Sequence, residues 1–138
     1  MKRFLLRILP VSLGLIFSVS LAMAHHSFTA EYDRAKPITL TGTVTKVEWM
    51  NPHVYFYMDV KDEKDGMVTN WAFELGNPAG LYRNGWKKEA LKIGGNATVA
   101  GWLAKDGKPR VNANTVTMDG KRLFAGSSAG NDDGYGEK

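Results

Sequence analysis

The 138-residue chain contains no cysteine. No disulfide can therefore stabilise the fold, and no thiol is available as a nucleophile or a metal ligand. A cysteine is also missing after the apolar N-terminal stretch, which excludes a lipid anchor at that point. We expect the fold to depend on burial of β-branched and aromatic side chains, of which the aromatic group comprises 4 Trp, 5 Tyr and 6 Phe.

Sequence signatures of enzymes are missing as well. The chain has neither a G-x-S-x-G nucleophile elbow nor a glycine-rich phosphate-binding loop. Its carboxylates, among them Glu31, Asp33, Glu48 and Glu74, follow no spacing that predicts a paired general acid and base. We therefore expect a binding protein rather than an enzyme.

The first 24 residues predict a signal peptide. Three cations, Lys2, Arg3 and Arg7, precede an apolar stretch, and Ala22-Met23-Ala24 supplies the small-residue cleavage pattern. A membrane anchor is the alternative, but an apolar run of about 17 residues is at the short limit for a spanning helix. We expect export to the periplasm by the general secretion route, cleavage after Ala24 and no remaining membrane anchor.

The charge of the chain changes once this segment is removed. The whole chain has 18 Lys and Arg against 14 Asp and Glu, a net charge of +4. Three of these cations belong to the signal peptide, so the remainder has a net charge near +1 and no basic stripe. Nucleic acid is therefore not an expected partner.

Alternating polar and apolar residues predict three strands in the first half of the chain, at Lys36–Trp49, His53–Val60 and Val68–Leu75. In the first of them the alternation slips by one residue near Lys46, which indicates a β-bulge. The Asp65-Gly66 pair predicts a hairpin turn between the second strand and the third.

The second half predicts a helical segment and two more strands. Asn77-Pro78 is typical of a helix N-cap followed by the first helical residue. We expect the helical segment to continue to Leu91 with a break at Asn84-Gly85. Strands follow at Asn96–Ala104 and Arg110–Met118, and a Gly/Ser/Asp-rich tail, residues 126–138, is predicted to be disordered.

This order of elements predicts a mainly β domain. Three strands, a helical link and two strands, with a bend in the first strand, are typical of a five-stranded OB-fold-like barrel. We place the barrel at residues 36–125, after an N-terminal arm at residues 25–35. An immunoglobulin-like sandwich is the alternative, but that fold needs about seven strands.

Five sequence strings carry a family resemblance: HHSFTAEYD, PITLTGTVTKVEWMNPH, NWAFELGNP, GWKKEALKIGG and KRLFAGSS. Together they resemble an uncharacterised bacterial family of small exported proteins, domain of unknown function 6152. The similarity extends over about residues 24–128. It implies a periplasmic, OB-like domain, and it implies no particular activity.

A histidine pair would begin the mature protein. Cleavage after Ala24 exposes the α-amino group of His25, which can chelate a metal together with its own Nδ1. A second imidazole then completes a three-nitrogen site, called a histidine brace; His26 offers a variant that uses the intervening amide. Nitrogen-rich, near-planar sites favour Cu(II), so copper is the expected cofactor.

His53 is the remaining histidine and a candidate third ligand. It follows Asn51-Pro52 at the start of the predicted second strand. Glu31 and Asp33 are close enough in sequence to the histidine pair to serve as oxygen ligands or as hydrogen-bond acceptors. The alternative is structural, since a polar chain end and a histidine at a strand edge are common without any metal.

A second candidate site uses the outer face of the predicted second and third strands. Tyr55 and Tyr57 would lie beside Asn70 and Glu74, on the surface where OB-folds bind oligosaccharides and oligonucleotides. Two functions follow from the sequence. The first is capture or carriage of Cu(II); the alternative is a stress-associated adaptor that binds a protein or a saccharide on its barrel face.

Overall fold

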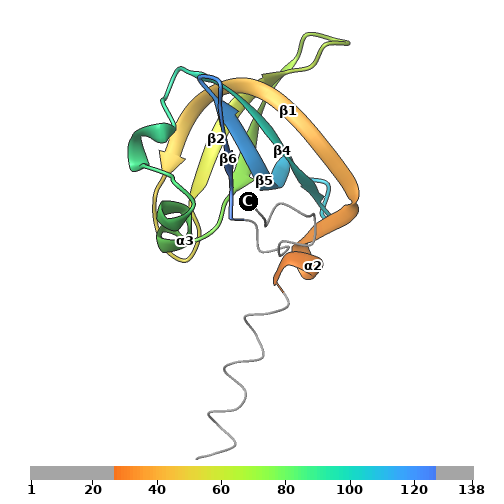
Figure 1. Cartoon of the computed structure of the whole chain (residues 1–138). Coiled ribbons are helices and arrows are strands. Elements are labelled where there is room, and N and C mark those ends of the chain that lie inside the picture. Colours follow the sequence, from red (N-terminus) through yellow and green to blue (C-terminus); the bar gives the residue numbers. More distant parts are fainter. Residues whose placement is uncertain (1–26, 127–138) are drawn as a thin grey trace, which may run out of the picture.

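The computed structural model describes residues 27–126, which form one six-stranded, mainly antiparallel sheet with short helical segments (Figure 1). The strand order is β3-β2-β1-β4-β5-β6. The elements are α2 (Ser27–Glu31), β1 (Tyr32–Glu48), β2 (Tyr55–Lys61), β3 (Val68–Glu74), α3 (Pro78–Arg83), the 3-10 helix η2 (Lys88–Ala90), β4 (Asn96–Ala104), β5 (Arg110–Met118) and β6 (Lys121–Phe124).

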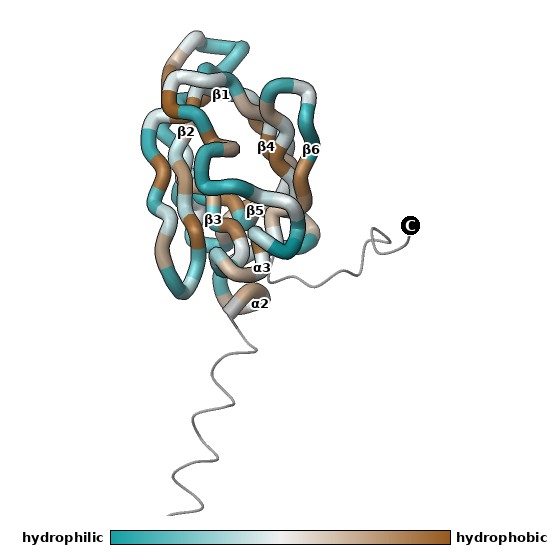
Figure 2. The backbone as a smooth tube through the Cα atoms, turned by 60° about the vertical axis from the view of Figure 1, so that its left-hand side comes forward, coloured by the Kyte–Doolittle hydropathy of each residue, from teal (hydrophilic) through white to brown (hydrophobic). Residues whose placement is uncertain are grey.

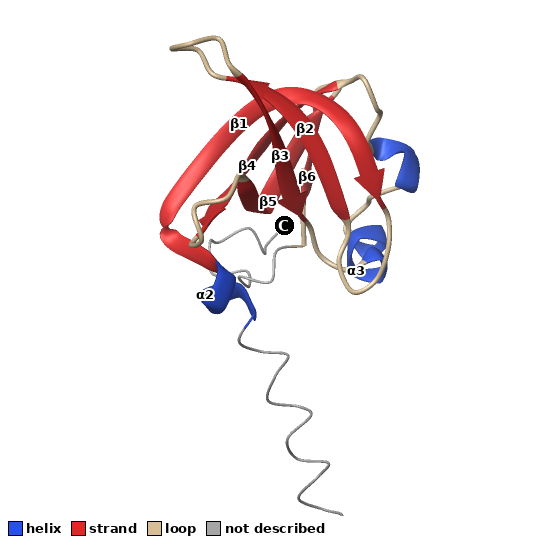
Figure 3. Ribbon diagram, turned by 180° about the vertical axis from the view of Figure 1, so that it is seen from behind, coloured by secondary structure: helices blue, strands red, loops and turns tan. Residues whose placement is uncertain are grey.

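Strand β1 is the longest element and arches over the rest of the sheet (Figure 3). Its first part pairs with β4, and its last part pairs with β2. The register with β2 shifts between Val44 and Lys46, so the predicted bulge is confirmed. A bulge bends a strand and increases its twist. The bend allows the first part of β1 to pair with β4 and the last part to pair with β2.

The sheet also makes a parallel contact between β3 and β5. Phe73 pairs with Val111, and Glu74 pairs with Asn112. This contact joins the start of β5 to the end of β3 although the two strands are not neighbours in the main strand order. It therefore brings polar residues from distant parts of the sequence to one end of the sheet.

The interior follows the predicted alternation. Val54, Phe56, Met58 and Val60 are buried, while the residues between them are partly or fully exposed. The ring of Phe56 stacks on that of Phe73 with centroids 5.1 Å apart. Figure 2 shows hydrophobic and hydrophilic residues alternating along the strands. Because successive side chains point to opposite faces, one face of each strand supplies the core.

The predicted helical link is confirmed and is short. The side chain of Asn77 caps α3 by accepting a hydrogen bond from the Gly80 amide at 2.8 Å, and Pro78 begins the helix. The helix ends at Arg83, and Gly85 follows with a φ of 83°. A positive φ costs little only for glycine, which explains why the helix breaks at Asn84-Gly85.

The strand count and several strand boundaries differ from the sequence-based expectation. The five-strand count was wrong by one, because Lys121–Phe124 forms β6 and pairs with β5. Four residues are too few for a recognisable alternation. Strand β1 begins at Tyr32 rather than Lys36, and β2 begins at Tyr55 rather than His53.

The start of β1 is held by a small apolar cluster of its own. Phe28 and Tyr32 are buried against Ala104, and Phe28 packs edge-on against Trp102 with ring centroids 5.5 Å apart. The Lys105 amide donates a hydrogen bond to the Glu31 carbonyl at 2.8 Å. Helix α2 is thereby fixed against the hairpin between β4 and β5.

Several predictions concern residues outside the described range. These are the signal peptide, the histidine pair His25 and His26, and all of the predicted tail except Gly126.

Candidate functional site

A buried carboxylate lies at the end of β3. Glu74 is only 5% exposed, and both of its oxygens accept hydrogen bonds. The Tyr32 hydroxyl donates to Oε2 at 2.5 Å, and His53 Nδ1 lies 2.6 Å from Oε1. The Tyr55 hydroxyl also bonds to this carboxylate. A buried carboxylate without partners would be strongly destabilising, so these contacts offset the cost of burying Glu74.

Four different parts of the chain bring these side chains together. Tyr32 is the first residue of β1, and Tyr55 is the first residue of β2. Glu74 ends β3 directly opposite Tyr55 in the antiparallel register. His53 lies in the connection between β1 and β2, one residue after the cis Asn51-Pro52 peptide bond. The site is therefore a product of the sheet topology and not of any local motif.

The two tyrosines act as neutral donors. Burial, followed by the hydrogen bond and the negative charge of Glu74, raises the pKa of Tyr32 well above its ordinary value. Burial and then the charge of Glu74 raise the pKa of Tyr55 in the same way. Both hydroxyls thus keep their protons at physiological pH and hold the carboxylate oxygens in place.

His53 has the arrangement that metal-binding histidines commonly show. Its Nδ1 faces the buried carboxylate, and its side chain remains 29% exposed. Within residues 27–126, no group forms a hydrogen bond or ion pair with its Nε2. A histidine that donates Nδ1–H to a carboxylate presents an Nε2 lone pair in a fixed direction.

Arg110 links the site to α2. Its guanidinium lies over the Tyr32 ring at 5.4 Å from the centroid, and it forms an ion pair with Glu31 at 3.1 Å. A second, longer contact of 3.4 Å joins it to Asp106. Arg110 thus connects α2 to the start of β5.

The structure brings together only some of the predicted site residues. His53, Tyr55 and Glu74 converge, as described above. Tyr57 instead donates its hydroxyl hydrogen bond to Glu48 at 2.9 Å. The Asn70 amide bonds to Asp59 at 2.8 Å and to Thr45 at 3.1 Å.

The acidic residues next to the predicted histidine pair have partners of their own. Glu31 pairs with Arg110, while Asp33 lies 3.9 Å from Lys36 and accepts a hydrogen bond from the Ala35 amide. In the described part of the chain, no three His, Asp or Glu side chains are grouped as a metal site would require. Residues 27–126 therefore do not by themselves give His53 a set of three such ligands.

Sequence reasoning did not identify Tyr32 and Arg110 as parts of this site. Tyr32 belongs to the HHSFTAEYD string but shows no alternation with its neighbours, and Arg110 begins a predicted strand. The hydrogen bond between Tyr32 and Glu74 spans 42 positions of sequence, and the contact between Arg110 and Tyr32 spans still more. Only the fold, through the β3–β5 contact, could have shown them.

The fold and this site define a small, mainly β protein with a carboxylate-supported histidine at one end of its sheet. The chain belongs to a family of unknown function, DUF6152, whose model matches residues 14–113. No match was found among curated proteins. Each helical segment within residues 27–126 is too short to span a membrane.

Proposed function

We propose that this protein is a non-enzymatic, periplasmic binding protein that captures or carries Cu(II). The single observation that supports this function is the contact between His53 Nδ1 and the buried carboxylate of Glu74 at 2.6 Å. Protein metal sites commonly use such a carboxylate to fix the tautomer and direction of a histidine ligand. The partly exposed imidazole then offers Nε2 to a metal at the protein surface.

The proposed ligand set combines His53 with the mature N-terminus. After cleavage behind Ala24, His25 supplies its amine and Nδ1, and His53 supplies Nε2; His26 is the alternative partner of the amine. Tyr32 supports this combination, because it bonds to the same carboxylate as His53 and is separated from His25 by only seven positions. A three-nitrogen set favours Cu(II) over other divalent ions.

The surrounding residues have positioning roles in this proposal. Tyr32 and Tyr55 hold Glu74, and Glu74 holds the imidazole of His53. Copper and protons compete for the amine and the imidazoles. Affinity for copper is therefore expected to fall as the pH falls.

The proposal includes an OB-like barrel as the framework of the site. The parallel contact between β3 and β5 supports it, because that contact links the two ends of the strand order β3-β2-β1-β4-β5. In such a barrel the end of β3 and the start of β5 meet at one rim. His53 would then present its Nε2 from the rim, next to the segment that carries the N-terminus.

The alternative of a saccharide- or protein-binding face has less support. The Tyr57 hydroxyl and the Asn70 amide already bond to Glu48 and Asp59 within the chain. Those polar groups would have to give up internal hydrogen bonds in order to bind a ligand. The carboxylate-supported histidine therefore favours copper.

The test compares copper affinity among variants of the exported protein, with its first residue verified by mass spectrometry. Affinity is measured by calorimetric competition against a chelator of known strength. We expect His53→Ala to weaken Cu(II) binding by at least about tenfold, and Glu74→Gln to weaken it by about 10- to 100-fold.

Glu48→Gln is the matched control, because Glu48 also accepts a tyrosine hydrogen bond but has no histidine partner. It should leave the copper affinity unchanged. Circular dichroism checks that each variant is folded. Native affinity in a folded His53→Ala variant would contradict the proposed role of His53.

A further inference from the structure

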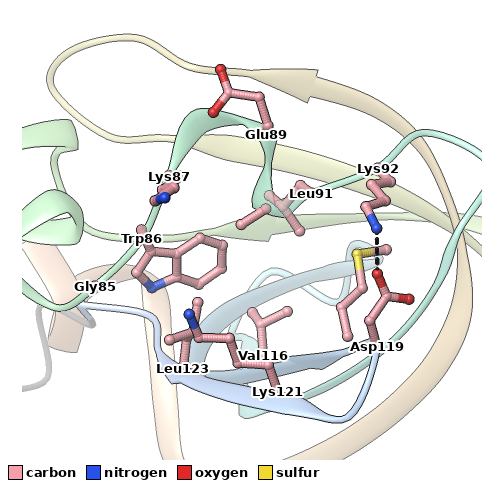
Figure 4. A pocket seen from close by; sticks show the side chains of 12 residues that line it. Gly85, Trp86, Lys87, Glu89, Leu91, Lys92, Val116, Asp119, Lys121 and Leu123 are labelled. Carbon is pink, nitrogen blue, oxygen red and sulfur yellow. Dashed lines mark hydrogen bonds and ion pairs between the residues drawn. The ribbon is translucent and has the colours of Figure 1, made fainter.

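A cavity lies on different elements from His53. It has a volume of about 380 Å³ and separates the link between α3 and β4 from the hairpin formed by β5 and β6 (Figure 4). Its size is within the range of small-molecule sites. The apolar part of its lining consists of Trp86, Ala90, Leu91, Val116, Met118 and Leu123.

Trp86 gives the cavity a fixed wall. The residue is 3% exposed, and its indole Nε1 donates a hydrogen bond to the Phe124 carbonyl at 2.8 Å. Its only polar atom is therefore already bonded, and the ring offers apolar contact alone. In Figure 4 the side chains of Trp86, Leu91 and Val116 point into the same space.

The rim of the cavity has a positive excess. Lys87, Lys92 and Lys121 contribute three ammonium groups. Asp119 pairs with Lys92 at 2.6 Å, and its carboxylate neutralises the charge of Lys92. Lys87 and Lys121 form no ion pair with any residue between 27 and 126, and the carboxylate of Glu89 points away from the cavity (Figure 4). Two ammonium groups thus border an apolar space without a carboxylate partner.

We propose that this cavity binds a small organic anion that has an apolar chain or ring, such as a medium-chain monocarboxylate. The apolar part would pack against Trp86 and Leu91, and the carboxylate would lie between Lys87 and Lys121. A charge-assisted contact of this kind is stronger than a neutral hydrogen bond. The proposal is independent of copper, because none of its residues contacts the His53 site.

The experiment titrates the isotopically labelled protein with octanoate and follows the amide signals and the Trp86 indole signal by nuclear magnetic resonance. We expect saturable shifts confined to the cavity residues. Acetate lacks the chain and octyltrimethylammonium has the opposite charge, so neither should produce these shifts. The proposal would be overturned by equal shifts with octyltrimethylammonium. It would also be overturned by octanoate shifts that are spread over the protein and not confined to the cavity residues.

Two kinds of variant make the test specific. Lys121→Glu should weaken octanoate binding by about tenfold, since it replaces an attractive charge with a repulsive one. Lys61→Glu changes an exposed lysine that does not line the cavity, and it should have no effect. Ala90→Phe should fill the cavity and abolish binding while copper affinity stays native. Unchanged octanoate binding in both Lys121→Glu and Ala90→Phe would show that the anion binds elsewhere.

Discussion

At the scale of single residues, Glu74 explains most of the candidate site. The alternation of β3 directs Phe73 into the core, and Glu74 is nevertheless buried because it ends the strand beneath Tyr32. Its charge is tolerated only because Tyr32, Tyr55 and His53 direct polar hydrogens at it. Removing one of these donors should therefore lower the free energy of unfolding more than removing an equivalent hydrogen bond at the surface.

Tyr32→Phe tests that statement. The substitution deletes one hydroxyl from a buried carboxylate, and we expect the free energy of unfolding to fall by about 1–3 kcal/mol. Tyr57→Phe is the matched control, because its hydroxyl bonds to the more exposed Glu48. Tyr57→Phe should lower the free energy of unfolding less than Tyr32→Phe does. Denaturant unfolding measures both variants, and an equal loss in the two would contradict the special position of Glu74.

Stability should also depend on pH through the same tyrosine. Its raised pKa means that the folded protein keeps the phenol proton at a pH where the unfolded chain has lost it. The unfolded state then binds fewer protons, so the free energy of unfolding must fall as the pH rises above about 10. In Tyr32→Phe this alkaline fall should be shallower. An equally steep fall would show that Tyr32 is not responsible for it.

At the scale of elements, the close packing of β4 against β5 depends on a glycine. Gly101 lies in β4, where the register with β5 shifts between Ala100 and Gly101. A Cβ at this position would overlap with the backbone carbonyl of Asn112 on β5. Because β5 also pairs with β3, a displacement there would reach the end of the sheet that holds Glu74.

Gly101→Ala is therefore expected to destabilise the protein by about 1–3 kcal/mol through overpacking. Gly80→Ala in α3 is the control, because a Cβ there would meet only the Asn77 side chain, at 3.4 Å or more. That change should be neutral or slightly stabilising, since alanine favours a helix. Thermal unfolding compares the two variants. A Gly101→Ala protein as stable as the native one would contradict the close approach of β4 and β5.

At the scale of the whole molecule, patterns with a short period could be predicted and contacts between distant strands could not. The alternation around Phe56, the slip near Lys46 and the cap at Asn77 are local, so the sequence was sufficient to predict β2, the bulge and the start of α3. The four residues of β6 are too short for such a pattern. The pairing of Tyr32 with Glu74 joins positions 42 residues apart.

In the candidate site, too, the sequence could predict some residues and not others. His53 could be selected from the sequence because histidine is rare in this chain and chemically distinctive. Its carboxylate partner could not, since Glu74 was expected on an outer binding face and is instead buried beneath Tyr32 and His53. The cavity beside Trp86 left no sequence signal, because its lining comes from a loop and two strands.

The central claim is that copper binds a free N-terminal amine together with His53. The most direct measurement compares the Cu(II) affinity of the native exported protein with that of a form carrying three additional alanines before His25. The added residues place three amides between the amine and His25, more than the one or two that a joint chelate with an imidazole can include, and they leave every side chain in residues 27–126 unchanged. The account predicts that the extended form binds Cu(II) at least about tenfold more weakly. Equal affinity of the two forms would contradict it.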